Sequence, residues 1–138
     1  DLPDALPKLP PVIQQRVKHI VTENARTLDA VEALRAGDLV RTGELFNASH
    51  TSLRDDYEVS CTELDVIVAL AQEQPGCYGA RMSGGGFGGC AVALVDKAHV
   101  EAFVAAVAPA YTQQTGLTPD LYAVLPSPGS GVGITFCV

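Results

Sequence analysis

The sequence predicts an α+β fold in which helices pack on one face of a small, mostly antiparallel sheet. Apolar residues recur at three- and four-residue steps over residues 12–34, which indicates a long amphipathic helix. Further along, two short apolar segments flank a run with five glycines in six positions, 84–89. The expected helices precede and separate the strands without a regular βαβ repeat, which disfavours a parallel sheet. With 138 residues, the chain is about one domain and can bury its own core.

The first expected helix has two distinct faces and a clear end. Gly37 is expected to end it, and Asp38 to cap the next helix, which carries Leu39, Leu45 and Phe46. The apolar face of the first helix consists of Val12, Ile13, Val17, Ile20, Val21, Leu28, Val31 and Leu34. Its polar face carries Gln14, Arg16, Lys18, Glu23 and Asn24.

The remaining elements follow from capping and turn residues. Ser60 and Glu63 have the spacing of a capping box, which opens a helix that ends at Pro75-Gly76. Strands are expected over Cys77–Met82 and Gly89–Val95, paired antiparallel, and a further strand over Asp120–Leu125. Between these strands, Asp96 caps a helix that carries Val100, Phe103, Val104, Val107 and Tyr111, with a kink at Pro109 and an end at Gly116. We expect a proline-rich lead over 1–11, the domain over 12–126 and a tail over 127–138, whose residues Ile134–Val138 match no recognised pattern.

The glycine-rich loop admits two interpretations. Glycine adopts positive φ freely and has no Cβ, so such a loop can present backbone N–H groups to a phosphate or another oxyanion. It can equally be a tight strand connection without a ligand. Gly84, Gly86 and Gly89 fit the dinucleotide pattern G-x-G-x-x-G, but a strand follows where that pattern needs a helix, and Pro109 stands where it needs an acid. No Lys-Ser or Lys-Thr follows the glycines, and no protein-kinase motif occurs, so the P-loop and protein-kinase families are excluded.

A more specific resemblance lies in Gly-Ala-Arg-Met-Ser-Gly-Gly-Gly-Phe-Gly-Gly-Cys, residues 79–90. It resembles the third signature motif of the GHMP small-molecule kinase family, in the form found in its galactokinase branch. Three further stretches are similar to that branch, so the resemblance runs from about Val12 to Val132. They are Val21-Thr22-Glu23-Asn24, Ser49-His50-Thr51-Ser52-Leu53, and the run Asp56–Cys61 continued by Glu63-Leu64-Asp65. Because family chains usually stop near Val132, the resemblance says nothing of the last residues.

The resemblance implies the family's C-terminal domain type and an ATP-dependent phosphorylation of galactose to galactose 1-phosphate. It implies ATP and Mg²⁺ as cofactors, bound mainly by an N-terminal domain that would also supply the catalytic base. We therefore expect a piece of a longer enzyme, in agreement with Met82 as the only methionine. This piece would pack on its own N-terminal domain, carry no catalytic residue and be inactive alone. It would supply a substrate- and phosphate-binding loop, with Phe87 as a buried anchor. The loop residues are Ser83, Gly84, Gly85, Gly86, Phe87, Gly88 and Gly89.

Candidate support residues for this loop are Arg81, His50 and Tyr57. Arg81 could face a phosphate or pair with a carboxylate that holds the loop. His50, expected at a helix end, suits a structural hydrogen bond or a chemical role, and Tyr57 suits core packing or the edge of a sugar pocket. His19 and His99 are expected on solvated helix faces. The acids Asp55, Asp56 and Glu58 are read as caps and solvated charge rather than as metal ligands, so no metal site is predicted.

Composition narrows the class of protein. The net charge of −7 argues against nucleic acid as a partner, and no apolar run is long enough for a membrane span. The four cysteines show no metal-binding spacing and are expected to be reduced and mostly buried, which favours a cytoplasmic protein. Two alternatives stay open: a non-catalytic sugar- or nucleotide-binding module of the same fold, and a structural or dimerising domain.

Overall fold

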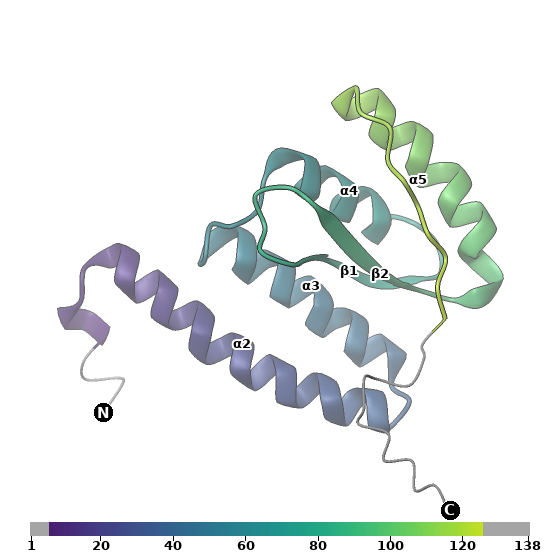
Figure 1. Cartoon of the computed structure of the whole chain (residues 1–138). Coiled ribbons are helices and arrows are strands. Elements are labelled where there is room, and N and C mark those ends of the chain that lie inside the picture. Colours follow the sequence, from purple (N-terminus) through teal and green to yellow (C-terminus); the bar gives the residue numbers. More distant parts are fainter. Residues whose placement is uncertain (1–5, 126–138) are drawn as a thin grey trace, which may run out of the picture.

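The computed structural model describes residues 6–125 and confirms the α+β class. In Figure 1 the β-hairpin lies between α3 and α5, and α2 forms an outer layer beyond α3. The expected tail 127–138, with Ile134–Val138, and part of the proline-rich lead lie outside the described residues. The elements in chain order are η1 (Leu6–Lys8), α2 (Pro11–Arg35), α3 (Leu39–Asp55), α4 (Thr62–Gln72), β1 (Cys77–Ser83), β2 (Cys90–Val95), η2 (Lys97–His99) and α5 (Val100–Thr115).

The two strands pair antiparallel, as the sequence predicts. Their register runs from Ser83 opposite Cys90 to Cys77 opposite Val95, so the glycine-rich loop closes one end of the hairpin. The free edge of β1 is covered by α3 instead of a third strand. Asn47 Oδ1 accepts the N–H of Ala80 at 2.9 Å, and His50 Nδ1 accepts the N–H of Met82 at 3.3 Å. These side chains satisfy strand donors that would otherwise be buried without partners.

The contact between α3 and β1 is so close that only glycine fits on both sides of it. A Cβ on Gly43 would lie 1.9 Å from the carbonyl oxygen of Tyr78, and a Cβ on Gly79 would lie 2.1 Å from that of Gly43. Helix and strand therefore touch through their backbones, and this contact fixes the position of α3 along β1.

The core lies where α3, α4 and α5 meet β1. It contains three groups of buried side chains, and α4 contributes to each of them: Leu53, Leu64 and Met82; Val68, Ala71 and Ala80; Leu70, Val107 and Tyr111. Met82 and Val107 are fully buried, so the strand that leads into the glycine loop is held by tight packing.

The packing of α2 inverts the expected amphipathicity. Helix α2 contacts mainly α3, and its only buried residues are His19 and Ala33. Its apolar residues instead form an exposed stripe, which we call the α2 stripe: Val12, Ile13, Ile20, Val21, Leu28, Val31 and Leu34, with exposed fractions of 40–69%. The spacing predicted the helix correctly, but a periodicity cannot tell which neighbour an apolar face meets.

Two further expectations about local structure are wrong. Residues 120–125 form no strand, because only Leu121 packs against the α5 core group while Tyr122, Val124 and Leu125 are about four-fifths exposed. Ser60 and Glu63 form no capping box: α4 begins after Cys61 without a side-chain cap, and the Ser60 hydroxyl donates to Asp65 Oδ1 at 2.6 Å instead.

The other helix ends agree with the sequence. Asp38 accepts the N–H of Arg41 at the start of α3, and Asp96 accepts that of Ala98 at the start of η2. Gly37 and Gly116 adopt positive φ at the ends of α2 and α5. Pro109 lies inside α5, which continues to Thr115.

The cysteines and the histidine of α2 depart in part from expectation. Cys61 and Cys77 are free and half-buried, whereas Cys90 is free but exposed at the loop, and Cys137 lies outside the described residues. His19, expected on a solvated face, is buried and stacks on Tyr57. No helix within residues 6–125 has the length and apolar character to cross a membrane.

Candidate functional site

The glycine-rich loop, residues 83–89, offers open backbone at the end of the hairpin. Gly84, Gly86, Gly88 and Gly89 have φ values between 83° and 126°, a region that residues with a Cβ rarely adopt. A Cβ on Gly84, Gly85, Gly88 or Gly89 would meet nothing within 4 Å. The missing side chains therefore leave room for a ligand to approach the backbone, and only Gly86 is glycine because of the protein's own packing.

Gly86 and Phe87 seat the loop on the connection between α3 and α4. The N–H of Phe87 donates to the carbonyl oxygen of Val59 at 2.7 Å, and a Cβ on Gly86 would lie 2.0 Å from the same oxygen. The expectation of Phe87 as a buried anchor is wrong, because its side chain is 75% exposed. Its backbone N–H does the anchoring, at a φ of 60°, and the ring projects from the loop.

Arg81 is held by a carboxylate just before the loop, the second of its two expected roles. Its Nη1 lies 3.3 Å from Glu23 Oε1, and its Nε donates to the carbonyl oxygen of Met82 at 3.0 Å. Glu23 also accepts from the Ser49 hydroxyl and, at 2.8 Å, from Arg26 Nε. Burial raises the pKa of Glu23, but these hydrogen bonds and the arginine charges outweigh burial and keep it below its ordinary value. The cluster ties α2 and α3 to the end of β1.

His50 fixes the same strand from α3. It lies inside that helix rather than at its end, and it is buried. Because Nδ1 accepts the N–H of Met82, the proton of the neutral ring lies on Nε2, 3.3 Å from Asp65 Oδ1 but too poorly aligned for a full hydrogen bond. Burial lowers the pKa of His50 below its ordinary value, and the carboxylate of Asp65 opposes that shift without reversing it. A neutral, structural histidine is the result.

Tyr57 and the neighbouring acids lie at the end of α3 and in the α3–α4 connection, where the acids form ion pairs and the tyrosine ring is stacked. The ring of Tyr57 stacks on His19 with centroids 4.4 Å apart. Asp55 pairs with Arg54 at 2.7 Å, Asp56 with Lys18 at 2.7 Å and Glu58 with Arg16 at 2.5 Å. Over residues 6–125, no three His, Cys, Asp or Glu side chains converge as metal ligands do. His99, half-exposed, faces Asp96 at 3.6 Å.

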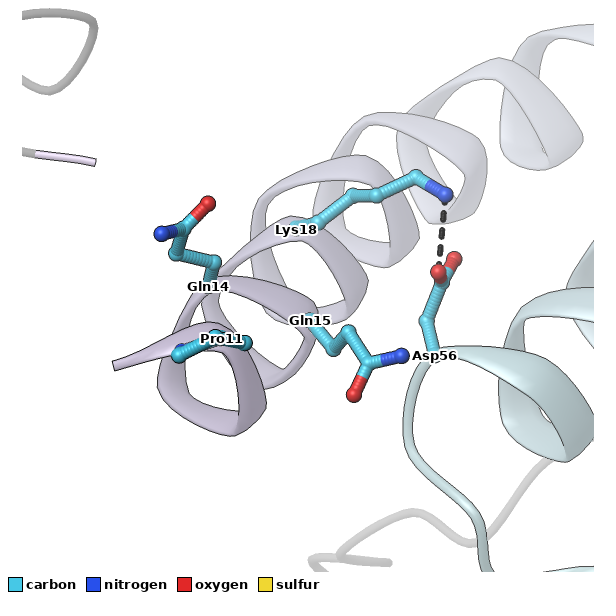
Figure 2. A pocket seen from close by; sticks show the side chains of 5 residues that line it. All are labelled: Pro11, Gln14, Gln15, Lys18 and Asp56. Atoms are coloured by element: carbon cyan, nitrogen blue, oxygen red, sulfur yellow. Dashed lines mark hydrogen bonds and ion pairs between the residues drawn. The ribbon is translucent and has the colours of Figure 1, made fainter. Parts of the chain in front are cut away.

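Two hollows elsewhere on the domain are less suitable as a ligand-binding site than the loop. The first, beside the start of α2, is lined by Pro11, Gln14, Gln15, Lys18 and Asp56. Figure 2 shows that its two charged side chains, Lys18 and Asp56, are paired with each other. The second is a mostly apolar groove between α2 and α3 that ends at the Glu23 cluster, whose charges are paired.

Comparison with known proteins decides the family. The family model described as GHMP kinases C terminal matches residues 30–113. The chain belongs to the GHMP kinase family. The resemblance seen in residues 79–90 is thereby confirmed, and the match covers the part of this GHMP domain from the end of α2 to α5.

The most similar relatives share one activity by name. The galactokinase of Chloroflexus aurantiacus is 52% identical over 128 residues, and that of Enterococcus faecalis is 54% identical over 112 residues. These matches cover 93% and 81% of this chain but only 32% and 29% of the relatives, so the chain spans about a third of their length.

Solved structures show the same fold. The structure of Lactococcus lactis galactokinase complexed with galactose superposes with a TM-score of 0.77 at 50% identity, over 79% of this chain and 28% of that one. The L. major mevalonate kinase in complex with R-mevalonate superposes with a TM-score of 0.56 at 38% identity, over 66% of this chain and 26% of that one.

Three residues that shape the site escaped the sequence analysis as site residues. Val59 supplies the carbonyl that seats the loop, Asn47 caps the edge of β1, and Glu23 gathers Arg26, Ser49 and Arg81. No local pattern marks these roles, because each depends on a contact with a segment 26 or more residues away in sequence: Val59 with Phe87, Asn47 with Ala80, and Glu23 with Ser49 and Arg81.

Proposed function

We propose that this GHMP domain is the C-terminal domain of a galactokinase, which phosphorylates galactose with ATP to galactose 1-phosphate. The observation that carries the proposal is the open backbone of residues 83–89, in a chain 52–54% identical to named galactokinases. A Cβ at four of the five glycines there would meet nothing within 4 Å, and Gly85 lacks positive φ as well, so neither packing nor backbone conformation accounts for a glycine at position 85.

The loop contributes preorganised N–H dipoles to the active site. Phosphoryl transfer depends on positioning and on neutralising the charge that spreads over the transferred group. Backbone N–H groups of residues 83–89, apart from that of Phe87, which is donated to Val59, meet that need when fixed before the substrate arrives, since fixed dipoles need no reorganisation during the reaction. Two contacts supply that rigidity: the hydrogen bond from the Phe87 N–H to the carbonyl oxygen of Val59, which we call the Val59 seat, and the ion pair of Arg81 with Glu23 just before the loop.

ATP and Mg²⁺ fit this domain differently. The loop suits the oxygen atoms of a phosphate or sugar hydroxyl, whereas the described residues offer no set of metal ligands. ATP supplies the transferred phosphoryl group, and its Mg²⁺ would be held by the rest of the enzyme. Glu23, which pairs with Arg81 of β1, is also engaged by Ser49 and Arg26 and is unsuited as a base. We therefore expect no galactose-dependent ATP hydrolysis or phosphorylation by the 138 residues alone; turnover by the purified chain would contradict this.

The α2 stripe is the surface on which the rest of the enzyme packs. A row of exposed apolar side chains on a helix whose other side already packs on α3 favours a large partner surface. The partner is the enzyme's own N-terminal domain, and the matched relatives are about three times as long as this chain.

The experiment that tests the loop is Gly85→Ala in the full-length enzyme. Gly85 does not have positive φ and a Cβ there meets nothing within 4 Å, so the free energy of unfolding should change by no more than about 0.5 kcal/mol. If a phosphate or sugar approaches this backbone, the added methyl group should lower kcat/KM about tenfold or more. The control is Gln113→Ala, at an exposed position of α5. Unchanged kcat/KM for both galactose and ATP in folded Gly85→Ala enzyme would return the loop to a structural role, whereas a full-length parent protein without any turnover would favour a non-catalytic module.

A further inference from the structure

Among residues 6–125, two residues other than glycine have left-handed backbone, and both lie at the hydrogen bond between the loop and the α3–α4 connection. Glu58 has a φ of 57° and Phe87 a φ of 60°. This region is disfavoured for such residues and persists only where the surroundings enforce it. The two residues lie in different segments, which meet where the Phe87 N–H donates to the carbonyl oxygen of Val59 at 2.7 Å. The strain is therefore concentrated on both sides of the seat of the glycine-rich loop.

The orientation of the Val59 carbonyl depends on its neighbours in the α3–α4 connection. The N–H of Val59 donates to the carbonyl oxygen of Leu53 at 3.0 Å, which holds one side of the residue against the end of α3. The preceding residue, Glu58, must keep its left-handed conformation for the chain to reach that position. What holds Glu58 consequently determines where the loop is seated.

Arg16 of α2 holds Glu58 in place. Its Nη2 donates to Glu58 Oε2 at 2.5 Å, and its Nη1 donates to the backbone carbonyl of Asp56 at 2.6 Å. A planar guanidinium that binds two groups at once fixes their relative position, which the flexible ammonium of lysine does not. The adjacent pair of Lys18 with Asp56, drawn in Figure 2, attaches the same turn of α2 to the connection.

We propose that Arg16 is a positioning residue for the glycine-rich loop, acting through Glu58 and the carbonyl of Val59. Arg16 makes no hydrogen bond to the loop itself; it fixes the backbone on which the loop rests. The catalytic consequence rests on the function proposed above for the loop, whereas the structural coupling does not.

The coupling is measured by amide hydrogen exchange of Phe87 in the 138-residue chain, followed by NMR. Arg16→Gln and Glu58→Ala should each accelerate exchange at Phe87 about tenfold, the lower end for a charge-assisted hydrogen bond because Glu58 is half-exposed. Glu58→Gly should accelerate it less than Glu58→Ala, because glycine accepts the left-handed conformation without strain. Arg35→Gln, which breaks the exposed Arg35–Glu32 pair on the same helix, is the matched control and should leave Phe87 unchanged.

Exchange at Phe87 that is unchanged in both Arg16→Gln and Glu58→Ala overturns the proposal. If Arg16→Gln fails to fold, Glu58→Ala decides alone, and unchanged exchange at Phe87 in that variant overturns the proposal. In the full-length enzyme the same variants should lower kcat about tenfold, with a smaller change in KM for galactose, because a displaced donor acts mainly in the transition state. Faster exchange with unchanged kcat would support the coupling and count against the catalytic role of the loop.

Discussion

Replacing Gly86 with alanine tests how rigidly the loop is seated. The backbone at Gly86 has a φ of 83°, and an added Cβ would lie 2.0 Å from the carbonyl oxygen of Val59, where ordinary van der Waals contact begins near 3.4 Å. The loop must therefore withdraw by more than an ångström, and it loses the hydrogen bond from Phe87 to Val59. Gly84 offers a matched control, since its φ is 85° and nothing lies within 4 Å of its Cβ position.

The magnitudes separate conformational strain from the clash. Left-handed backbone costs alanine about 1–2 kcal/mol at either position. Loss of the hydrogen bond adds about 1 kcal/mol at Gly86 alone, so Gly86→Ala should lower the free energy of unfolding by about 2–3 kcal/mol and Gly84→Ala by about 1–2 kcal/mol. A displacement near 1 Å at an active site can cost about a hundredfold in rate, which is the fall in kcat expected for full-length Gly86→Ala enzyme.

Urea denaturation of both variants measures the stability difference, and steady-state kinetics of the full-length enzyme measures kcat per folded molecule. Equal free energies of unfolding for Gly84→Ala and Gly86→Ala would refute the reasoning, because the Val59 seat would then exert no constraint. If Gly86→Ala lowers the free energy of unfolding as expected but leaves kcat per folded molecule unchanged, the contact with Val59 holds the loop without affecting turnover.

Two further predictions follow from burial and from the α2 stripe. Because the pKa of His50 is lowered in the folded state, protonation favours the unfolded chain; stability is full above the unfolded-state pKa of about 6.5 and falls as the pH drops below it. Thermal unfolding between about pH 7.5 and 5.5 should show this fall, and His50→Gln should make it shallower; a slope in His50→Gln equal to that of the parent chain would contradict the assignment. Leu28→Glu, at a side chain 69% exposed, should change the unfolding free energy of this chain by no more than about 0.5 kcal/mol yet destabilise the full-length enzyme by about 2 kcal/mol or more, since leucine is buried there. Equal effects in the two proteins would show that the α2 stripe is not covered by the rest of the enzyme.

Local signals in the sequence determined the elements and the family. The helical spacing of α2, the Asp38 cap, the glycine ends at Gly37 and Gly116, and the antiparallel hairpin were all predicted, because each depends on residues close together in the chain. The motif at residues 79–90 indicated the family for the same reason: a strand, a glycine loop and a strand are contiguous.

Only the tertiary structure decided which surfaces meet. Periodicity identified an apolar face on α2 but not that the helix buries His19 and leaves Leu28 exposed, since burial depends on the neighbour and not on the spacing. The loop sequence suggested Phe87 as an anchor, yet the backbone contact with Val59, 28 residues earlier, holds the loop and leaves the ring outside. Long-range contacts of this kind are chosen when helices and hairpin pack together, because many apolar arrangements satisfy the same sequence pattern and only close fits such as Gly43 against Gly79 select one.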